Sequence, residues 1–419
     1  MIDFTSNSGF GLKRRHRAEA RFQWAGRGAI LISLAFLALM FFTILRDGVG
    51  ALWQQQIAVT VDLSADNVDP ADIGDASFGK LVKTGLSETF PDITKRKDKK
   101  ELYGLVSTEA PFEVERQVRA DPALVGGKVT LWVTASDDAA LYLNGAVDMD
   151  LPQKKRRISD VESALLDTLG AAGRTREVFN TGFFTNGDSR EPEIAGILSA
   201  LVGSALSIAV CFALSFPIGI LAAVYLEEFA PRNRMSDLIE VNINNLAAVP
   251  SIVFGLLGLA VFLGYMGLPR SSPLVGGMVL SLMTLPTIII ASRASLKSVP
   301  PSIKEAALAL GATPVQAIFH HVFPVALPGM LTGAIVGMAR ALGDTAPLLM
   351  IGMVAFIVDV PKSILEPATA LPVQIFLWAD APERAFTEKT AAAIIVLLTF
   401  LIAMNLIAIL LRRKLQVRF

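Results

Sequence analysis

The residues with the clearest chemical potential lie inside an apolar run. The stretch GAIVGMARALGDTAPLLMIGMVAFIV, residues 333–358, is apolar enough to cross a bilayer, yet it carries Arg340 and Asp344 near its middle. If a helix enters the membrane near Ala326, Arg340 lies about 21 Å along it at 1.5 Å per residue. A charge at that depth costs about 3 kcal/mol on insertion scales, so such residues usually face a bundle interior or a water-filled path.

The spacing of the two charges suggests their roles. Asp344 follows Arg340 by four residues, so one helix face would carry both and they would pair. The planar fork of an arginine matches two oxygens of a tetrahedral oxyanion and stays charged at any relevant pH. We expect Arg340 to bind an oxyanion and Asp344 to orient it, with Thr345 on the same substrate pathway. An ion pair that only locks helix packing is the alternative.

Side chains that could support catalysis or hold a cofactor are scarce. Cys211 is the only cysteine and there are three histidines, which argues against a disulfide, an iron–sulfur cluster and a metal site. GDASFGK, residues 74–80, matches part of a nucleotide-binding loop, but Leu81 replaces the hydroxyl residue that would hold magnesium. We therefore expect no catalytic residue, metal or cofactor, and any ATP hydrolysis must come from another chain.

Composition predicts an all-α polytopic membrane protein. The 419 residues are 53% hydrophobic and 18% charged, with a mean hydropathy of +0.52, too apolar for an ordinary soluble domain. A bilayer core about 30 Å thick needs roughly 20 apolar residues in a helix. Six runs meet this need, one N-terminal anchor and a five-helix core: 28–45, 194–226, 238–265, 274–296, 326–358 and 390–411.

Basic residues predict the orientation. The N-terminus is basic, with Lys13, Arg14, Arg15, Arg17 and Arg21 ahead of the first run, which places residues 1–27 in the cytoplasm. Six crossings bring the basic tail, residues 412–419, to the same side. Both termini are therefore expected inside. Arg293, close to the cytoplasmic end of its run, is expected to anchor this topology at the lipid headgroups.

This topology exports residues 46–193, a segment of domain size. KVTLWVTASDDAALYLNG, residues 128–145, indicates β-rich runs joined by a turn at SDD. KKRRISDVESALLDTLGAAG, residues 154–173, indicates a helix whose cap and stop come from Ser159 or Asp160 and from Gly170 or Gly173. We predict a small α+β extracytoplasmic domain, in which the basic run 154–157 is a solvated face or attracts anions.

The cytoplasmic segment 298–325 joins the fourth and fifth runs. Within it, PPSIKEAALALG indicates a short helix that begins at the prolines, is capped by Ser302 and stops at Gly311. One face of this helix carries an apolar stripe at helical spacing, made of Ile303, Ala306, Ala307 and Leu310. A short amphipathic helix between two spans must bury this stripe on its own bundle or in a groove of a soluble partner.

The segment resembles the EAA loop of ABC-importer permeases. The matching residues are Glu305, Ala306, Ala307, Gly311 and Pro324, whereas the usual Ile-x-Leu-Pro ending reads His321-Val322-Phe323-Pro324. In that family the short helix docks on a separate cytoplasmic ATPase. The resemblance therefore implies that these residues couple the chain to such a subunit.

Two further stretches resemble phosphate-importer permeases of the PstA type. ARALGDTAPLL, residues 339–349, is similar to their Ala-Arg-Ala-x-Gly-Glu-Thr-Ala-Pro-Leu stretch, with Asp344 where Glu is usual. FFTNGDSREPEIAGI, residues 183–197, is similar to the start of the core in a subgroup with an extra N-terminal region. The resemblance implies a permease core at 194–411 in a bacterial inner membrane. It also implies a second homologous permease subunit, an ATPase dimer and an extracytoplasmic phosphate-binding protein.

Two other functions remain open. A sulfate or molybdate permease would use the same arginine chemistry, and the stretch around Arg340 is what favours phosphate. A non-transporting membrane receptor would need a sizeable cytoplasmic output domain, whereas the longest cytoplasmic segment is the loop at 298–325. The formal net charge of +0 gives no reason to expect a nucleic-acid partner. Membrane lipid is the other expected partner.

Overall fold

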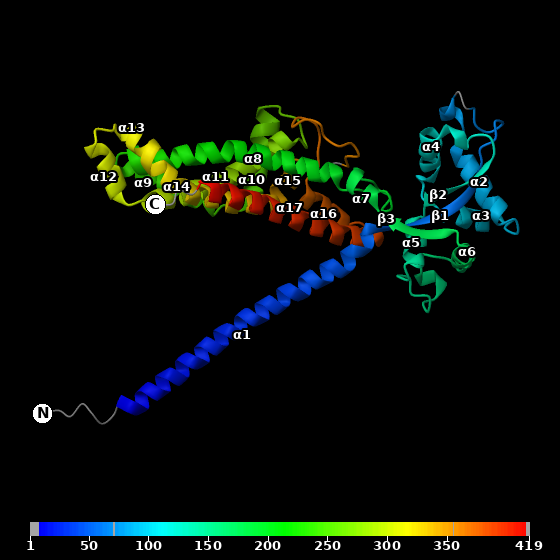
Figure 1. The fold of residues 1–419 in the computed structure, drawn as a ribbon, viewed down its shortest axis with the longest axis horizontal. Helices are drawn as coiled ribbons and strands as arrows, with labels where there is room; N and C mark the ends of the chain where they lie inside the picture. Colours follow the sequence, from blue (N-terminus) through cyan, green and yellow to red (C-terminus); the bar gives the residue numbers. More distant parts are fainter. Residues whose placement is uncertain (1–7, 70–71, 355, 416–419) are drawn as a thin grey trace.

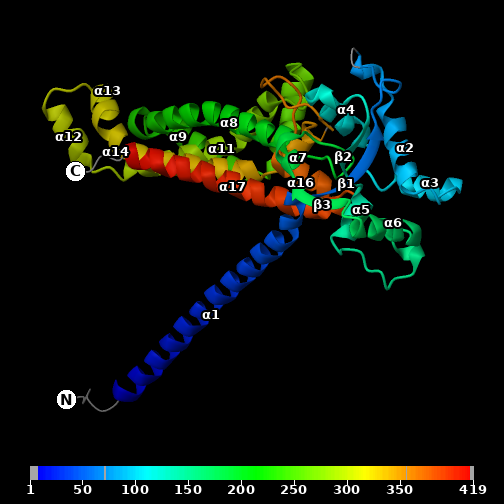
Figure 2. The same cartoon turned by 45° about the vertical axis from the view of Figure 1, so that its right-hand side comes forward.

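The computed structural model describes residues 8–69, 72–354 and 356–415, so the expected cytoplasmic ends are described only in part. An elongated helical bundle carries a small α+β domain at one end (Figure 1). Helix α1 (Ser8–Val49) meets the bundle at that end and diverges from it towards the other, as Figure 2 shows from a second direction.

Five helices in the described residues are long and apolar enough to cross a membrane, or six spans if one bent pair counts as a span. Besides α1, they contain α8 (Leu198–Val224), α11 (Pro273–Lys297), α14 (Phe323–Gly343) and α17 (Ala385–Leu415). The bent pair is α9 (Arg234–Ala247) with α10 (Ser251–Leu257) and the π-helix η6 (Gly258–Tyr265), at an angle of 103°. The predicted all-α membrane architecture is confirmed. The prediction of one continuous helix at 238–265 and another at 326–358 is wrong, because each is broken.

Shorter elements complete the bundle. They are the π-helices η5 (Tyr225–Phe229) and η7 (Ile318–Val322) and the helices α12 (Pro301–Ala309), α13 (Pro314–Ala317), α15 (Ala346–Met350) and α16 (Leu371–Ala379).

Small residues let α8 and α11 pack closely. A Cβ atom on Gly277 of α11 would lie 2.5 Å from Val210 Cβ and 2.7 Å from the backbone oxygen of Ser207. Close approach of this kind is how helices associate in lipid, where no hydrophobic force drives them together. The two helices form the framework against which the broken helices pack.

The α+β domain is a three-stranded antiparallel sheet with helices around it. The strand order is β2 (Lys128–Thr134), β1 (Trp53–Asp62), β3 (Thr175–Phe179), and alternate side chains of β1 enter the core. The surrounding helices are η1 (Gly50–Leu52), η2 (Ile73–Asp75), α2 (Phe78–Thr89), α3 (Arg96–Tyr103), α4 (Ala110–Ala120), η3 (Pro122–Leu124), α5 (Asp137–Leu143), η4 (Gln153–Lys155), α6 (Asp160–Ala171) and α7 (Thr181–Thr185). The predicted α+β domain is confirmed.

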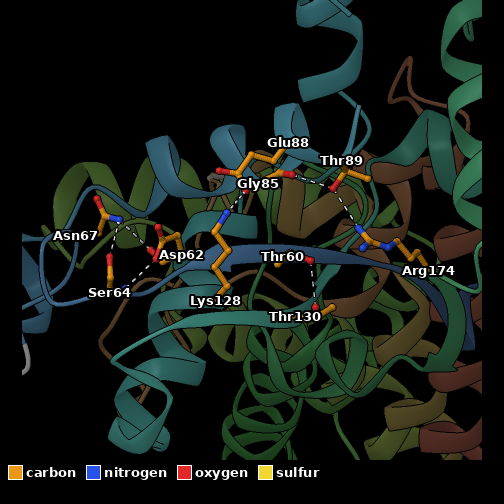
Figure 3. A network of polar contacts seen from close by, with 10 residues as sticks. All are labelled: Thr60, Asp62, Ser64, Asn67, Gly85, Glu88, Thr89, Lys128, Thr130 and Arg174. Atoms are coloured by element: carbon orange, nitrogen blue, oxygen red, sulfur yellow. Dashed lines mark hydrogen bonds and ion pairs between the residues drawn. The ribbon is translucent and has the colours of Figure 1, made fainter. Parts of the chain in front are cut away.

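Polar contacts fix α2 to the sheet, as Figure 3 shows. Lys128 Nζ lies 2.6 Å from Glu88 Oε2, and Arg174 Nη1 donates to Thr89 Oγ1 over 3.1 Å. Gly85 allows the approach, because a Cβ atom there would collide with the backbone oxygen of Thr60. The helix therefore lies directly against the central strand.

One predicted strand of this domain is a helix. Residues Asp137–Leu143 form α5, because Asp137 and Asp138 in its first turn favour a helix N-terminus. The predicted helix at 154–173 is confirmed as α6, with Ser159 and Glu162 in a capping box. Gly173, with φ of +65°, follows its end.

The α+β domain and the bundle meet at a polar junction. Lys389 of α17 is 5% exposed and donates to the backbone oxygen of Ala195. Trp378 Nε1 donates to Asp188 Oδ1 over 3.1 Å, and Arg157 Nη2 donates to the Pro382 oxygen over 2.9 Å. Part of the basic run therefore fastens the domain to the bundle, which corrects the expectation of a purely solvated face.

Carboxylates at this junction are poorly solvated. Burial, with the nearby charges of Asp138 and Glu193, raises the pKa of Asp137 to about 7, and Arg157 opposes the shift. Burial also raises the pKa values of Asp188 and Glu193. The folded chain therefore holds these protons more tightly than the unfolded chain.

We predict that the contribution of Asp137 to stability falls as the pH rises. The stabilisation from the Asp137 proton is complete below its ordinary pKa of about 4 and is lost as the pH approaches about 7. Asp137→Asn should raise the thermal unfolding temperature at pH 8 by a few degrees and flatten its decline between pH 5 and pH 8. Asp92→Asn, which removes an exposed carboxylate of the same domain, is the control, and equal slopes in both variants would contradict the prediction.

Candidate functional site

The helix that carries Arg340 ends earlier than the apolar run predicts. α14 stops at Gly343, and Asp344 has an extended backbone with φ of −88° and ψ of 113°. Pro347 explains the break, because in a continuous helix its ring would clash with the carbonyl of Gly343 and it has no N–H to donate. The predicted pairing of Arg340 and Asp344 on one helix face is therefore wrong.

Arg340 lies on an exposed face in the last turn of α14. Val336 and Gly343 share this face at helical spacing, and Val336 is 59% exposed. Within the described ranges, the Arg340 guanidinium has neither an ion pair nor a hydrogen bond. The C-terminal end of a helix favours a cation, but a guanidinium at this depth also needs a polar environment from outside the chain.

Asp344 lies where two helix breaks meet. Ser251 Oγ, in the first turn of α10, donates to Asp344 Oδ1 over 3.1 Å. One turn further along, Gly255 lies so close to α15 that a Cβ atom there would be 2.7 Å from Pro347 Cα. The break between α9 and α10 and the break between α14 and α15 are thus held against each other.

Thr345 adjoins Asp344 at the start of α15, and its side chain makes no capping hydrogen bond. Of the three residues expected on a substrate pathway, the structure keeps Asp344 and Thr345 at the break and leaves Arg340 on the outer face of α14. The sequence reasoning missed Ser251. The signal was present, because Pro250 before Ser251, and Pro347 shortly after Gly343, each mark a place where one helix stops and another begins.

The loop at 298–325 forms the short helix α12 at the end of the bundle remote from the α+β domain (Figure 1). Pro300 is the N-cap and Ser302 lies inside the helix, so the predicted Ser302 cap is wrong. The predicted stop is confirmed: the helix ends at Ala309, and Gly311 has φ of +92°, a conformation that favours glycine. Pro324 lies in the first turn of α14.

The predicted apolar stripe is divided between the bundle and solvent. Ala307 is 6% exposed and Ile303 packs on the bundle, whereas Leu310 is 90% exposed. A pocket of about 570 Å³ is lined by Ile303, Ala306, Ala307, Leu310, Gly311, Ala312 and His321. Glu305 is exposed on the same helix. Residues that match the EAA pattern thus surround one apolar pocket, with Leu310 uncovered beside it.

Arg293 is bound within the protein and does not act as a headgroup anchor. Its Nε donates to Glu227 Oε2 over 3.2 Å, and its Nη2 donates to Glu240 Oε2 over 2.9 Å. The Arg293 side chain is 15% exposed. The sequence reasoning missed both carboxylates, because they lie on η5 and α9, far from Arg293 along the chain.

Comparison with known proteins identifies the family. Residues 215–417 match the family described as binding-protein-dependent transport system inner membrane component, and residues 10–153 match a domain of unknown function, DUF3333. The phosphate transport system permease protein PstA 1 of Mycobacterium tuberculosis is 30% identical over 239 residues, which cover 56% of this chain and 77% of that protein. The chain belongs to the PstA permease family.

Other matches cover the same part of the chain. PstA of Haemophilus influenzae is 29% identical over 223 residues, 53% of this chain and 78% of that protein. Among solved structures, the MetNI methionine ABC transporter in an inward-facing form has a TM-score of 0.40 at 17% identity, covering 53% of this chain and 95% of that chain. The residues that match the family description, 215–417, include both helix breaks and the loop at 298–325.

We predict that the contact between the two breaks is sterically tight. Gly255→Ala should lower the free energy of unfolding by about 1–3 kcal/mol, because the added methyl group would meet the backbone of Pro347. Gly343→Ala is the matched control, since a Cβ atom there meets nothing within 4 Å. Thermal unfolding in detergent measures both variants. If Gly255→Ala is as stable as Gly343→Ala, the breaks do not pack as described.

Proposed function

We propose that this chain is the transmembrane permease subunit of an ATP-driven importer of inorganic phosphate. The stretch Ala339–Leu349, at the helix break that carries Asp344, is the observation on which the proposal rests. Membership in a family with relatives named as phosphate transport permeases supports it. The substrate would cross between this chain and a second homologous permease subunit.

Arg340 is the proposed oxyanion ligand on this pathway. Its guanidinium is exposed and has no partner of its own among the described residues, so its donors are available to two oxygens of a phosphate ion. The exposed face of α14 would meet the second permease subunit, which would enclose the charge. Asp344 and Thr345 would line the pathway at the break, and Asp344 would keep the broken helices together through Ser251.

The proposed motor contact is the loop at 298–325. The exposed Glu305 and Ala306, the pocket beside Ala307 and Gly311, and the turn into α14 at Pro324 offer a compact surface for a cytoplasmic ATPase dimer. We propose that ATP is hydrolysed by that dimer and not by this chain. An extracytoplasmic phosphate-binding protein would deliver the substrate from the other side.

The proposed topology places both termini in the cytoplasm and residues 46–193 outside the inner membrane. The loop at 298–325 and the exported domain lie at opposite ends of the bundle, as this topology requires (Figure 1). A permease for sulfate or molybdate is the nearest alternative, because the same arginine chemistry would bind those oxyanions. A receptor that transports nothing is disfavoured, because the cytoplasmic loops lack an output domain.

We predict that Arg340→Gln reduces phosphate uptake by about 10- to 100-fold while the subunits still assemble. The loss of one charge-assisted hydrogen bond, worth about 1.5–3 kcal/mol, sets this range. Uptake of labelled phosphate into vesicles measures the effect, with sulfate and molybdate as competitors. Arg270→Gln, at an exposed arginine of another loop, is the control. Unchanged uptake by Arg340→Gln would make the arginine structural.

We also predict that Gly311→Ala weakens coupling. Alanine at a positive φ costs about 1–2 kcal/mol, and no steric collision adds to it because a Cβ atom there meets nothing within 4 Å. The loop should shift, so that ATP is hydrolysed with less transport or the ATPase dissociates; Glu305→Ala should act in the same direction. The ratio of ATP hydrolysed to phosphate imported measures both. If the Gly311→Ala transporter is fully coupled, the proposal that the loop docks on the ATPase is contradicted.

A further inference from the structure

A cluster of charged side chains connects the loop helix α12 to the bundle. Lys304 of α12 donates to Glu228 Oε2 on η5, and the neighbouring Glu227 accepts from Arg293 of α11. Lys297 lies 3.6 Å from the same Glu227 oxygen. With Glu240, three cations balance three carboxylates, so the cluster is neutral as a unit; we call these six residues the charge cluster.

The inner members of the charge cluster are shielded from solvent. The side chains of Glu228, Arg293 and Glu227 are 12%, 15% and 17% exposed. Ile303 of α12 and Ile243 of α9 pack on one apolar cluster beneath them. A contact that is fixed by both ion pairs and apolar packing moves as a unit, so a displacement of α12 reaches α9 and α11.

Helix α9 is the element that this displacement would move. None of its 14 residues is buried, so it has no core of its own to hold it in place. The Arg293 guanidinium holds the middle of α9 in place through its hydrogen bond with Glu240. α9 is about 21 Å long at 1.5 Å per residue, and its far end leads through Pro250 to Ser251 and the hydrogen bond with Asp344.

We infer that the charge cluster transmits movement of α12 to α9 and, through Ser251, to the helix breaks at Asp344. This inference deepens the proposed function and rests on it, since it names the residues that link the ATPase surface to the substrate pathway. Lys304 and Glu228 are positioning residues: they contact neither the substrate nor ATP, and they act through Arg293 and Glu240.

Charge reversal tests this link. Lys304→Glu and Glu228→Lys, made singly in the full chain assembled with its partners, each place like charges together and should reduce ATP-driven phosphate uptake about tenfold, a typical size for coupling between sites. The double variant restores an opposite pair and should recover uptake. Arg232→Glu, which makes the same change of charge at an exposed residue nearby, is the matched control.

A second readout does not depend on the substrate. Cys211 is the only cysteine and is buried, so spin labels can be attached to cysteines introduced at Met235 of α9 and Leu221 of α8, both exposed. The distance between the labels should change when ATP is added. This change should be lost in each single reversal, although the complex still assembles with the ATPase, and it should be recovered in the double variant.

The outcomes separate the two proposals. Single reversals that keep the uptake and the distance change of the unaltered chain would overturn the inference, as would a double variant that assembles but recovers neither. If the unaltered complex imports no phosphate while the distance change responds to the reversals as expected, the inference stands and the proposed substrate falls.

Discussion

A backbone inside a bilayer must satisfy its own hydrogen bonds, and this constraint explains the arrangement of the bundle. α8, α11 and α17 satisfy it as long helices, and the small residues of α8 and α11 make them a compact framework. Irregular backbone is tolerated only where it is covered by protein or faces a cavity. The two breaks meet this condition by packing on each other, with Ser251 and Asp344 as polar partners. The two helix breaks, where the backbone is least regular, are therefore covered by each other.

Arg293 and Arg340 differ in how their charge is compensated. Arg293 has carboxylates from two other elements within hydrogen-bond distance, so the chain itself neutralises it. Arg340 has no such compensation in the described residues, although both arginines are in long apolar helices. An uncompensated cation in a membrane helix is stable only if something outside the chain supplies the counter charge or water. The donors of Arg293 are therefore satisfied within the chain, whereas those of Arg340 remain available for a ligand.

The sequence predicted those features that depend on local chemistry. Hydropathy located the spans, and Ser159 and Gly311 marked the ends of their helices, because caps and positive-φ glycines act within one turn. The errors came from interactions between distant residues. The central strand β1 was not predicted, since its pairing with β2 and β3 joins residues about 70 to 125 positions apart. Arg340 and Asp344 were placed on one face because helix spacing was given more weight than the proline that follows.

The π-helix η7 (Ile318–Val322) has a consequence for α14. It connects α13 to α14 without interruption, and a π-turn accommodates one residue more than an α-turn. Each residue turns an α-helix by about 100°, so this extra residue sets the angular phase of every side chain on α14 relative to the loop. Without this extra residue, Arg340 would lie about 100° around the helix from the exposed face that it now occupies. The direction in which that guanidinium points is therefore decided some twenty residues before it, in the turn that leaves the loop.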